Sequence, residues 1–217
     1  MRGNMNGAWR AYGAEFVGTA WMVAVGTGSV ALGGSLLVIS LSFGLAVTLA
    51  IFALRGVSGA HINPAVSTGF VLTGHLPRER WLGYVLAQAT GGLLGSGVVH
   101  AVIGPDELAP TVFAEGLSTL SAVGIEVGIT AALMASILGV VAWRDDSTPT
   151  VAVVVGAVVA LLAFFFGPLT GASMNPARTL GPNLLSGAGG LVVYTLATVA
   201  GAVLAAAVVR WKDSAVP

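Results

Sequence analysis

The sequence predicts an all-α membrane protein, in which six transmembrane helices and two shorter re-entrant half-helices form an inverted repeat. Three observations lead to this fold class: the composition, six long apolar segments, and one short segment that occurs twice. Of the 217 residues, 56% are hydrophobic and 8% are charged, and the mean hydropathy is +0.92. Soluble domains carry about 25% charged residues. A chain this apolar could not cover itself with a polar surface in water.

The composition also excludes several functional classes. Nine basic and nine acidic residues give a formal net charge of zero, without the basic surface of a nucleic-acid-binding protein. The chain has no cysteine, and His61, His75 and His100 lie too far apart for a typical metal-ligand spacing. No nucleophile–base pair or phosphate-binding loop is visible. We therefore expect no nucleic-acid partner, no metal, no cofactor and no enzymatic activity.

Six segments are long and apolar enough to cross a membrane. A helix needs about 20 mostly apolar residues to span a hydrocarbon core of ~30 Å. Glycine, proline and charged residues separate these segments from one another. The predicted spans are residues 12–31, 35–54, 81–103, 120–143, 150–166 and 191–209.

The basic residues predict the orientation of the chain. With both termini in the cytoplasm, eight of the nine lysines and arginines lie on the inner side, as the positive-inside rule requires. These eight are Arg2, Arg10, Arg55, Arg78, Arg80, Arg144, Arg210 and Lys212. Arg178 is the exception, so it needs a separate explanation.

Two further segments are too apolar for ordinary loops and too short to span. Residues 63–73 and 175–185 each offer about eleven helix-compatible residues, which at 1.5 Å per residue reach about halfway across the bilayer. Both are interpreted as re-entrant half-helices. The irregular backbone before each one is tolerated at that depth only inside protein or beside water. The pattern therefore predicts an internal polar pathway.

A short segment occurs twice in nearly the same form. Residues 58–65 read Ser-Gly-Ala-His-Ile-Asn-Pro-Ala, and residues 170–177 read Thr-Gly-Ala-Ser-Met-Asn-Pro-Ala, at an offset of 112 (170 − 58). Glu15 recurs as Glu126, each followed four residues later by threonine, at an offset of 111 (126 − 15). The sequence thus contains two copies of one unit.

This duplication predicts one membrane domain, residues 1–217, built from repeats 10–104 and 119–211. Each repeat contains three full spans, an odd number, so the second copy sits upside down relative to the first. The two half-helices therefore enter from opposite sides, and their N-termini face each other near the midplane.

The repeated Asn-Pro-Ala has a mechanical interpretation. Asparagine is a favoured N-cap, and proline at the first helical position loses nothing because its missing N–H would be unbonded there. The side-chain oxygen of Asn63 or Asn175 then accepts a backbone N–H, which leaves the amide NH2 free to donate to the pathway. The facing helix ends, each equivalent to roughly +0.5 charge, disfavour cations and protonated water.

With these motifs the sequence resembles the aquaporin, or major intrinsic protein, family over its entire length. The paired boxes Asn63-Pro64-Ala65 and Asn175-Pro176-Ala177-Arg178 carry the resemblance. It implies a homotetramer in a lipid bilayer, here a prokaryotic inner or plasma membrane, with one pore per subunit. It also implies that the two asparagines donate to water and that loop carbonyls accept from it. By position these carbonyls belong to Ala60, His61, Ile62, Ala172, Ser173 and Met174.

The resemblance also implies a constriction on the outer side. By position it consists of Phe43, Ala163, Ala172 and Arg178, which accounts for the exceptional arginine. Water-selective members have histidine at position 163. Glycerol facilitators have tryptophan at 43, glycine at 163, phenylalanine at 172 and aspartate at 179. This chain matches neither set.

The intramembrane acids and one histidine allow two interpretations each. Glu15 and Glu126 either brace the re-entrant loops by accepting backbone N–H groups or act as proton or ion sites of a coupled transporter. We favour bracing, because the two residues recur symmetrically. His61 is interpreted as a structural hydrogen-bonding residue at the inner vestibule, with a pH gate as the alternative.

The expected function is a passive channel for water that excludes protons and ions. A filter widened by alanine at 163 and 172 is expected to pass small neutral solutes as well: glycerol, urea, ammonia or hydrogen peroxide. If side chains from the connection 104–118 fill that space, the protein is instead a strict water channel. The alternative from another class is a secondary transporter, since inverted repeats and broken helices also occur there.

Overall fold

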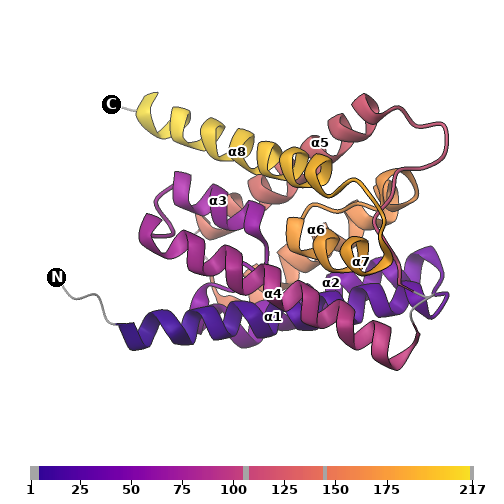
Figure 1. Cartoon of the computed structure of the whole chain (residues 1–217). Coiled ribbons are helices and arrows are strands. Elements are labelled where there is room, and N and C mark those ends of the chain that lie inside the picture. Colours follow the sequence, from indigo (N-terminus) through magenta and orange to yellow (C-terminus); the bar gives the residue numbers. More distant parts are fainter. Residues whose placement is uncertain (1–4, 105–107, 144–145, 216–217) are drawn as a thin grey trace.

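The computed structural model describes residues 5–104, 108–143 and 146–215, and these residues form eight α-helices and no strand (Figure 1). Arg2 and Arg144, which contribute to the predicted orientation, lie outside the described residues, as does the side chain of Lys212. The helices are α1 (Met5–Ala31), α2 (Leu36–Ser58), α3 (Pro64–Leu72), α4 (Arg78–Val102), α5 (Thr119–Val141), α6 (Thr148–Thr170), α7 (Pro176–Ser186) and α8 (Leu191–Ala215).

The six long helices occupy the six predicted spans, with differences at their ends. α6 was predicted to end at residue 166, but it continues through Pro168 to Thr170, where Gly171 ends it in a left-handed conformation. Proline this close to the last turn removes only one intrahelical bond, so the helix runs past it. Among the described residues, five helices are long and apolar enough to span a membrane.

α1 is not among those five, since it carries Arg10 and Glu15. With 27 residues it is about 40 Å long, which is enough to cross the hydrocarbon core. Its acidic residue faces the interior of the bundle and is fully buried, so lipid does not contact the carboxylate. α1 packs between α2 and α4, as α5 packs between α6 and α8 in the second half of the chain.

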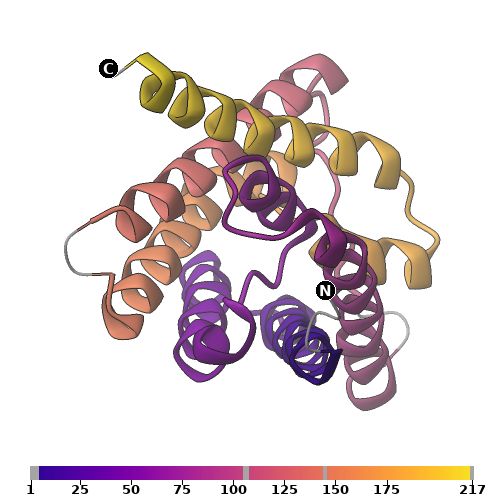
Figure 2. The ribbon, with the colours of Figure 1, turned by 90° about the vertical axis from the view of Figure 1, so that its left-hand side faces the viewer.

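The half-helices α3 and α7 have 9 and 11 residues, about 14 and 17 Å. Each reaches into the other half of the chain: α3 packs against α8, and α7 packs against α4. Figure 2 views the bundle from the end at which α1 begins and α8 ends. In this view the long helices surround the short ones. This arrangement brings the two Asn-Pro-Ala segments together inside the bundle.

Small residues allow the long helices to cross closely. A side-chain carbon on Gly91 of α4 would collide with the carbonyl oxygen of Phe16 on α1, and one on Gly201 of α8 would collide with that of Val127 on α5. Helices in lipid associate through such close contacts, because lipid is as apolar as their side chains. These glycines therefore serve the packing of the helices.

The outer surface of the bundle is apolar. On α2, leucines at intervals of four residues form an exposed stripe: Leu37, Leu41, Leu45 and Leu49. Large exposed apolar surfaces of this kind are rare on soluble proteins and indicate contact with lipid or with another subunit.

The start of α1 and the end of α8 lie at the same end of the bundle, as an even number of crossings requires (Figure 1).

Candidate functional site

The two repeated asparagines cap the half-helices as the sequence predicted. Asn63 has extended backbone (φ −158°), and its Oδ1 accepts from the backbone nitrogens of Ala65 at 2.9 Å and Val66 at 3.4 Å. Asn175 (φ −155°) accepts from Ala177 and Arg178 at the same two distances. Proline follows each asparagine at the first helical position, where its missing donor costs nothing.

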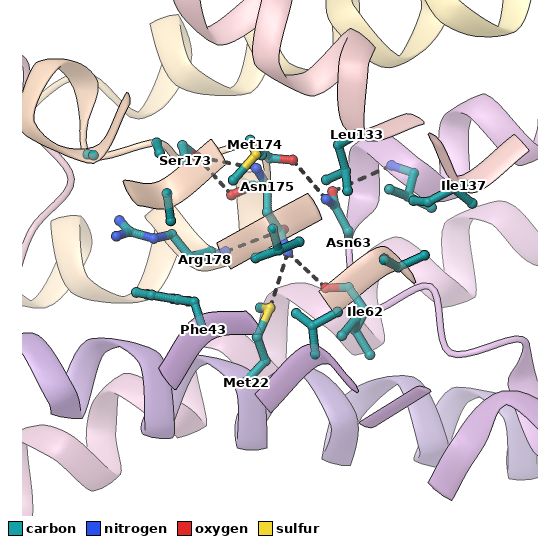
Figure 3. A pocket seen from close by; sticks show the side chains of 18 of the residues that line it. Met22, Phe43, Ile62, Asn63, Leu133, Ile137, Ser173, Met174, Asn175 and Arg178 are labelled. Carbon is teal, nitrogen blue, oxygen red and sulfur yellow. Dashed lines mark hydrogen bonds between the residues drawn. The ribbon is translucent and has the colours of Figure 1, made fainter. Parts of the chain in front are cut away.

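The amide groups of the two asparagines are less free than expected. Nδ2 of Asn63 donates to the carbonyl oxygen of Met174 at 2.8 Å, and Nδ2 of Asn175 donates to that of Ile62 at 2.9 Å (Figure 3). An amide NH2 carries two protons, so Asn63 keeps one N–H for another acceptor. The second N–H of Asn175 points to Sδ of Met22 at 3.8 Å, a weak acceptor with which water can compete (Figure 3). This cross-connection cannot be read from the sequence, since it requires the two loops to meet in space.

The loops before the half-helices have unusual backbone conformations. Ala60, Ile62, Ala172 and Met174 have φ values between 42° and 52°, the left-handed region that non-glycine residues avoid. Each such residue costs about 1 to 2 kcal/mol. The four positions form two pairs at the repeat offset of 112. Such strain persists only where surrounding contacts hold the backbone in place.

Glu15 supplies those contacts for the first loop. Its Oε1 accepts from the hydroxyl of Ser58 at 2.6 Å and the backbone nitrogen of His61 at 2.9 Å. Its Oε2 accepts from the backbone nitrogen of Ile62 at 2.6 Å and from Nε2 of Gln88 at 2.7 Å. Four donors therefore converge on one buried carboxylate. Two of them are backbone N–H groups of the loop, as expected if Glu15 braces it.

Glu126 has the same position in the second loop, with fewer partners. It accepts from the hydroxyl of Thr170 at 2.7 Å and from the backbone nitrogens of Ser173 at 2.9 Å and Met174 at 3.0 Å. The contacts recorded for it include no counterpart of the Gln88 amide. The two loops therefore share one design, but the first is held by one more donor.

Sequence reasoning missed two tyrosines that complete this framework. The hydroxyl of Tyr84 donates to the carbonyl oxygen of Ser58, and that of Tyr194 donates to the carbonyl oxygen of Thr170, both at 2.6 Å. Both tyrosines are almost fully buried. Their offset of 110 (194 − 84) is within two residues of the repeat offsets already found, so a search for further repeated residues could have identified them.

One cavity of about 560 Å³ connects most of the predicted site residues (Figure 3). The two capping asparagines, the four predicted constriction residues and the residues with predicted accepting carbonyls all line it. These are Phe43, Ala60, His61, Ile62, Asn63, Ala163, Ala172, Ser173, Met174, Asn175 and Arg178. Pro64, Ala65, Pro176, Ala177, Glu15 and Glu126 do not line it, so their contribution is to shape the loops behind it.

At one end of this cavity, Arg178 lies over the ring of Phe43, with its guanidinium carbon 4.9 Å from the ring centroid. Its Nη1 donates to the hydroxyl of Thr111, in the connection between α4 and α5. Other residues of this connection, Ala109, Pro110, Val112, Phe113 and Ala114, also line the cavity. No motif marks Thr111 in the sequence, so only the folded structure identifies it.

His61, which also lines the cavity, is held on several sides. Its Nδ1 lies 3.0 Å from the hydroxyl of Ser67, and its ring lies 4.6 Å from that of Phe70 and 4.9 Å from that of Tyr84. These contacts match the structural interpretation. In the described part of the chain, no group of three or more histidine, cysteine, aspartate or glutamate side chains could hold a metal ion.

Comparison with known proteins identifies the family. The family model described as Major intrinsic protein matches residues 4–209. The chain belongs to the major intrinsic protein family. It is 34% identical to a glycerol uptake facilitator protein-like 6 from Lactiplantibacillus plantarum, over 94% of this chain and 99% of that one. It is also 33% identical to aquaporin-4 from Mus musculus, over 94% of this chain and 67% of that one.

A solved structure shows the same fold. The X-ray structure of the aquaglyceroporin from Plasmodium falciparum superposes with a TM-score of 0.85 at 25% identity, over 96% of this chain and 97% of that chain. The inverted half-helices and the internal cavity are therefore features of a major intrinsic protein. Members of this family are passive channels and not enzymes, and the chain is accordingly an integral, multi-pass membrane channel.

Proposed function

We propose that this major intrinsic protein conducts water and also passes at least one small neutral solute among glycerol, urea, ammonia and hydrogen peroxide. The observation that carries this proposal is the cavity wall at its Arg178 end. Ala163 and Ala172 line the cavity together with Phe43 and Arg178, so two of the four constriction positions carry only a methyl group. A wall of this kind discriminates weakly, because apolar contacts separate solutes by only ~1 to 3 kcal/mol per group.

The polar groups of the site support passage of neutral molecules. Arg178 offers hydrogen-bond donors and repels cations, and the ring of Phe43 offers an apolar face beside it. Near the middle of the cavity, Asn63 retains one amide N–H, and the second N–H of Asn175 points to the weak acceptor Sδ of Met22 at 3.8 Å. The facing ends of α3 and α7 add two positive dipole ends there, which disfavour protons and other cations. A molecule with one polar and one carbon edge fits this combination.

Two alternatives remain to be tested. The connection 108–118 contributes side chains to the cavity beside Arg178, and this observation favours the strict water channel. A secondary transporter needs an intramembrane group that binds and then releases an ion or a proton in each transport cycle. The carboxylates of Glu15 and Glu126 already accept four and three hydrogen bonds from the loops, which argues against that role.

The proposal includes an orientation and an assembly. Residues 10–104 and 119–211 are the two inverted repeats of one channel domain, residues 1–217. Both termini face the cytoplasm, because this orientation places eight of nine basic residues inside. The membrane is that of a prokaryotic cell, a proposal supported by the similarity to a bacterial relative. The protein forms a homotetramer in which each subunit has its own pore. The exposed leucine stripe of α2 is compatible with such an assembly, since it offers an apolar face to lipid or to a neighbouring subunit.

Permeability measurements test the proposed function. Purified protein in liposomes is subjected to stopped-flow osmotic steps with water alone and then with glycerol or urea as the permeant. Ammonia entry is followed with a pH dye and hydrogen peroxide entry with a peroxide dye. We expect fast water flux and at least one solute flux that rises linearly with the gradient. Exclusion of all four solutes would establish a strict water channel, and saturable flux would indicate a transporter.

Native mass spectrometry tests the proposed assembly. The protein is released from several mild detergents, and a mass of four subunits is expected in each. A monomer in all of them would contradict the homotetramer.

A further inference from the structure

We infer that Asn183 is a positioning residue for Arg178, and that it acts through Thr111. In this arrangement Asn183 fixes the backbone of the connection between α4 and α5, and the hydroxyl of Thr111 then holds the guanidinium group at the constriction. The inference rests on the proposed role of Arg178 in solute selectivity.

Asn183 makes hydrogen bonds to both backbone groups of one residue. Its Oδ1 accepts from the backbone nitrogen of Thr111 at 2.8 Å, and its Nδ2 donates to the carbonyl oxygen of Thr111 at 2.9 Å. The second amide proton goes to the carbonyl oxygen of Gly189, also at 2.9 Å. Asn183 is fully buried in α7 and does not line the cavity. Its side chain is thus committed to holding the connection.

Thr111 joins this clamp to the arginine. It is 1% exposed, and its hydroxyl oxygen accepts from Nη1 of Arg178. The hydroxyl of Thr179, one helical turn before Asn183, lies 3.4 Å from the same oxygen. α7 therefore carries both the arginine and the side chains that fix the residue to which the arginine donates.

Two further contacts hold the connection near this point. The backbone nitrogen of Ala114 donates to the carbonyl oxygen of Leu169 at 2.8 Å, and the ring of Phe113 lies 4.8 Å from that of Tyr194. These contacts keep the connection against the second half of the chain when the Thr111 hydroxyl is removed. The effect of that hydroxyl can therefore be separated from the folding of the connection.

The expected consequence is a change in selectivity. Arginine has a long flexible side chain, and its guanidinium stays in one place only where contacts restrict it. The structure records the ring of Phe43 and the hydroxyl of Thr111 as such contacts. Without the hydroxyl, the guanidinium is held on one side only. The constriction then widens on average, and larger solutes gain relative to water.

Four variants in liposomes test the inference through the ratio of glycerol to water permeability per channel. Thr111→Val removes the hydroxyl but keeps the shape, and Thr111→Ser retains it. Asn183→Asp keeps the oxygen that accepts from the Thr111 nitrogen. It replaces the donating NH2 by a second oxygen, which faces the carbonyl oxygens of Thr111 and Gly189. Thr90→Val is the matched control, because Thr90 is exposed on α4 and donates only within its own helix.

We expect Thr111→Val and Asn183→Asp to raise the ratio by about fivefold, in line with the net contribution of one typical hydrogen bond. Thr111→Ser and Thr90→Val should stay within about twofold of the unmodified protein. A ratio that falls or does not change in Thr111→Val would overturn the inference, as would the same rise in Thr111→Ser. An unchanged ratio in Asn183→Asp would overturn the role of Asn183. If that variant fails to fold, Asn183→Ser, which removes the bonds to both backbone groups of Thr111 without adding a charge, takes its place under the same criterion.

Arg178→Ala separates this inference from the proposed function. If Arg178→Ala shifts the ratio and Thr111→Val does not, the inference fails and the proposed constriction stands. If Arg178→Ala leaves the ratio unchanged, the proposed role of this arginine fails, and the inference that rests on it fails too.

Discussion

The side-chain nitrogen of Asn175 lies 2.9 Å from the carbonyl oxygen of Ile62, which is 113 residues earlier in the chain. The hydrogen bond between them connects the second half-helix directly to the first loop. Asn63 makes the corresponding bond in the opposite direction, to the carbonyl oxygen of Met174 at 2.8 Å. The two halves of the channel are therefore held together at the point where the facing helix ends meet.

Replacing Asn175 with aspartate is expected to weaken the exclusion of protons. The substitution places a negative charge beside two positive helix ends and removes the donor to Ile62. A unit negative charge changes the energy of a cation a few Å away by a few kcal/mol. Proton flux through the channel should therefore rise by about tenfold or more. A pH dye inside liposomes measures the leak. Unchanged proton leak with unchanged water flux would show that this amide has no central role.

Replacing Ala163 with histidine is expected to suppress solute passage and spare most water flux. The imidazole would add volume and a donor at the proposed constriction, where Ala163 now lines the cavity with a methyl group. Glycerol or urea permeability should fall by about tenfold, which corresponds to the ~1 to 3 kcal/mol that pocket contacts contribute. Stopped-flow measurement of both fluxes gives the result. Ala163→Val adds volume without a donor, and comparison of the two variants separates width from hydrogen bonding.

If the unmodified protein already excludes these solutes, the histidine variant has nothing to suppress. That outcome would mean that the connection 108–118 closes the constriction on its own.

Replacing Glu15 with glutamine is expected to destabilise the fold. The carboxylate accepts four hydrogen bonds, and glutamine turns one acceptor into a donor that faces other donors. We expect a loss of about 2 to 4 kcal/mol in the free energy of unfolding. Glu126→Gln should cost less, because three donors meet that carboxylate. Thermal unfolding in detergent provides the measurement.

Glu79→Gln is the control for these two variants, because Glu79 is exposed in the first turn of α4. Its effect should stay below about 1 kcal/mol. The bracing role would be wrong if Glu15→Gln unfolded at the same temperature as Glu79→Gln.

Replacing Gly91 with alanine is expected to separate α4 from α1. The added carbon would collide with the carbonyl oxygen of Phe16, a backbone atom that cannot rotate away. Overpacking of this kind costs about 1 to 3 kcal/mol. Gly97→Ala in the same helix meets nothing within 4 Å and should be neutral or slightly stabilising. Equal melting temperatures for the two variants would refute the close-packing argument.

Much of the fold could be predicted because its signals are local. A run of about 20 apolar residues marks a span wherever it occurs, and all six predicted spans became helices. Asn63 and Asn175 cap their helices with groups two or three residues away, so the motif alone determines that contact. The repeat offsets, read from the sequence, also place Glu15 and Glu126 in equivalent surroundings. Helix ends were less predictable, as the continuation of α6 through Pro168 shows.

The sequence by itself therefore determined the spans, the helix caps and the duplication, since each depends on residues that are neighbours along the chain. Only the tertiary structure decided which distant groups meet. Ile62 receives the Asn175 amide across 113 residues, and Thr111 receives Arg178 across 67. No local pattern specifies either pair, because both depend on how two inverted halves and the connection between them pack around one cavity.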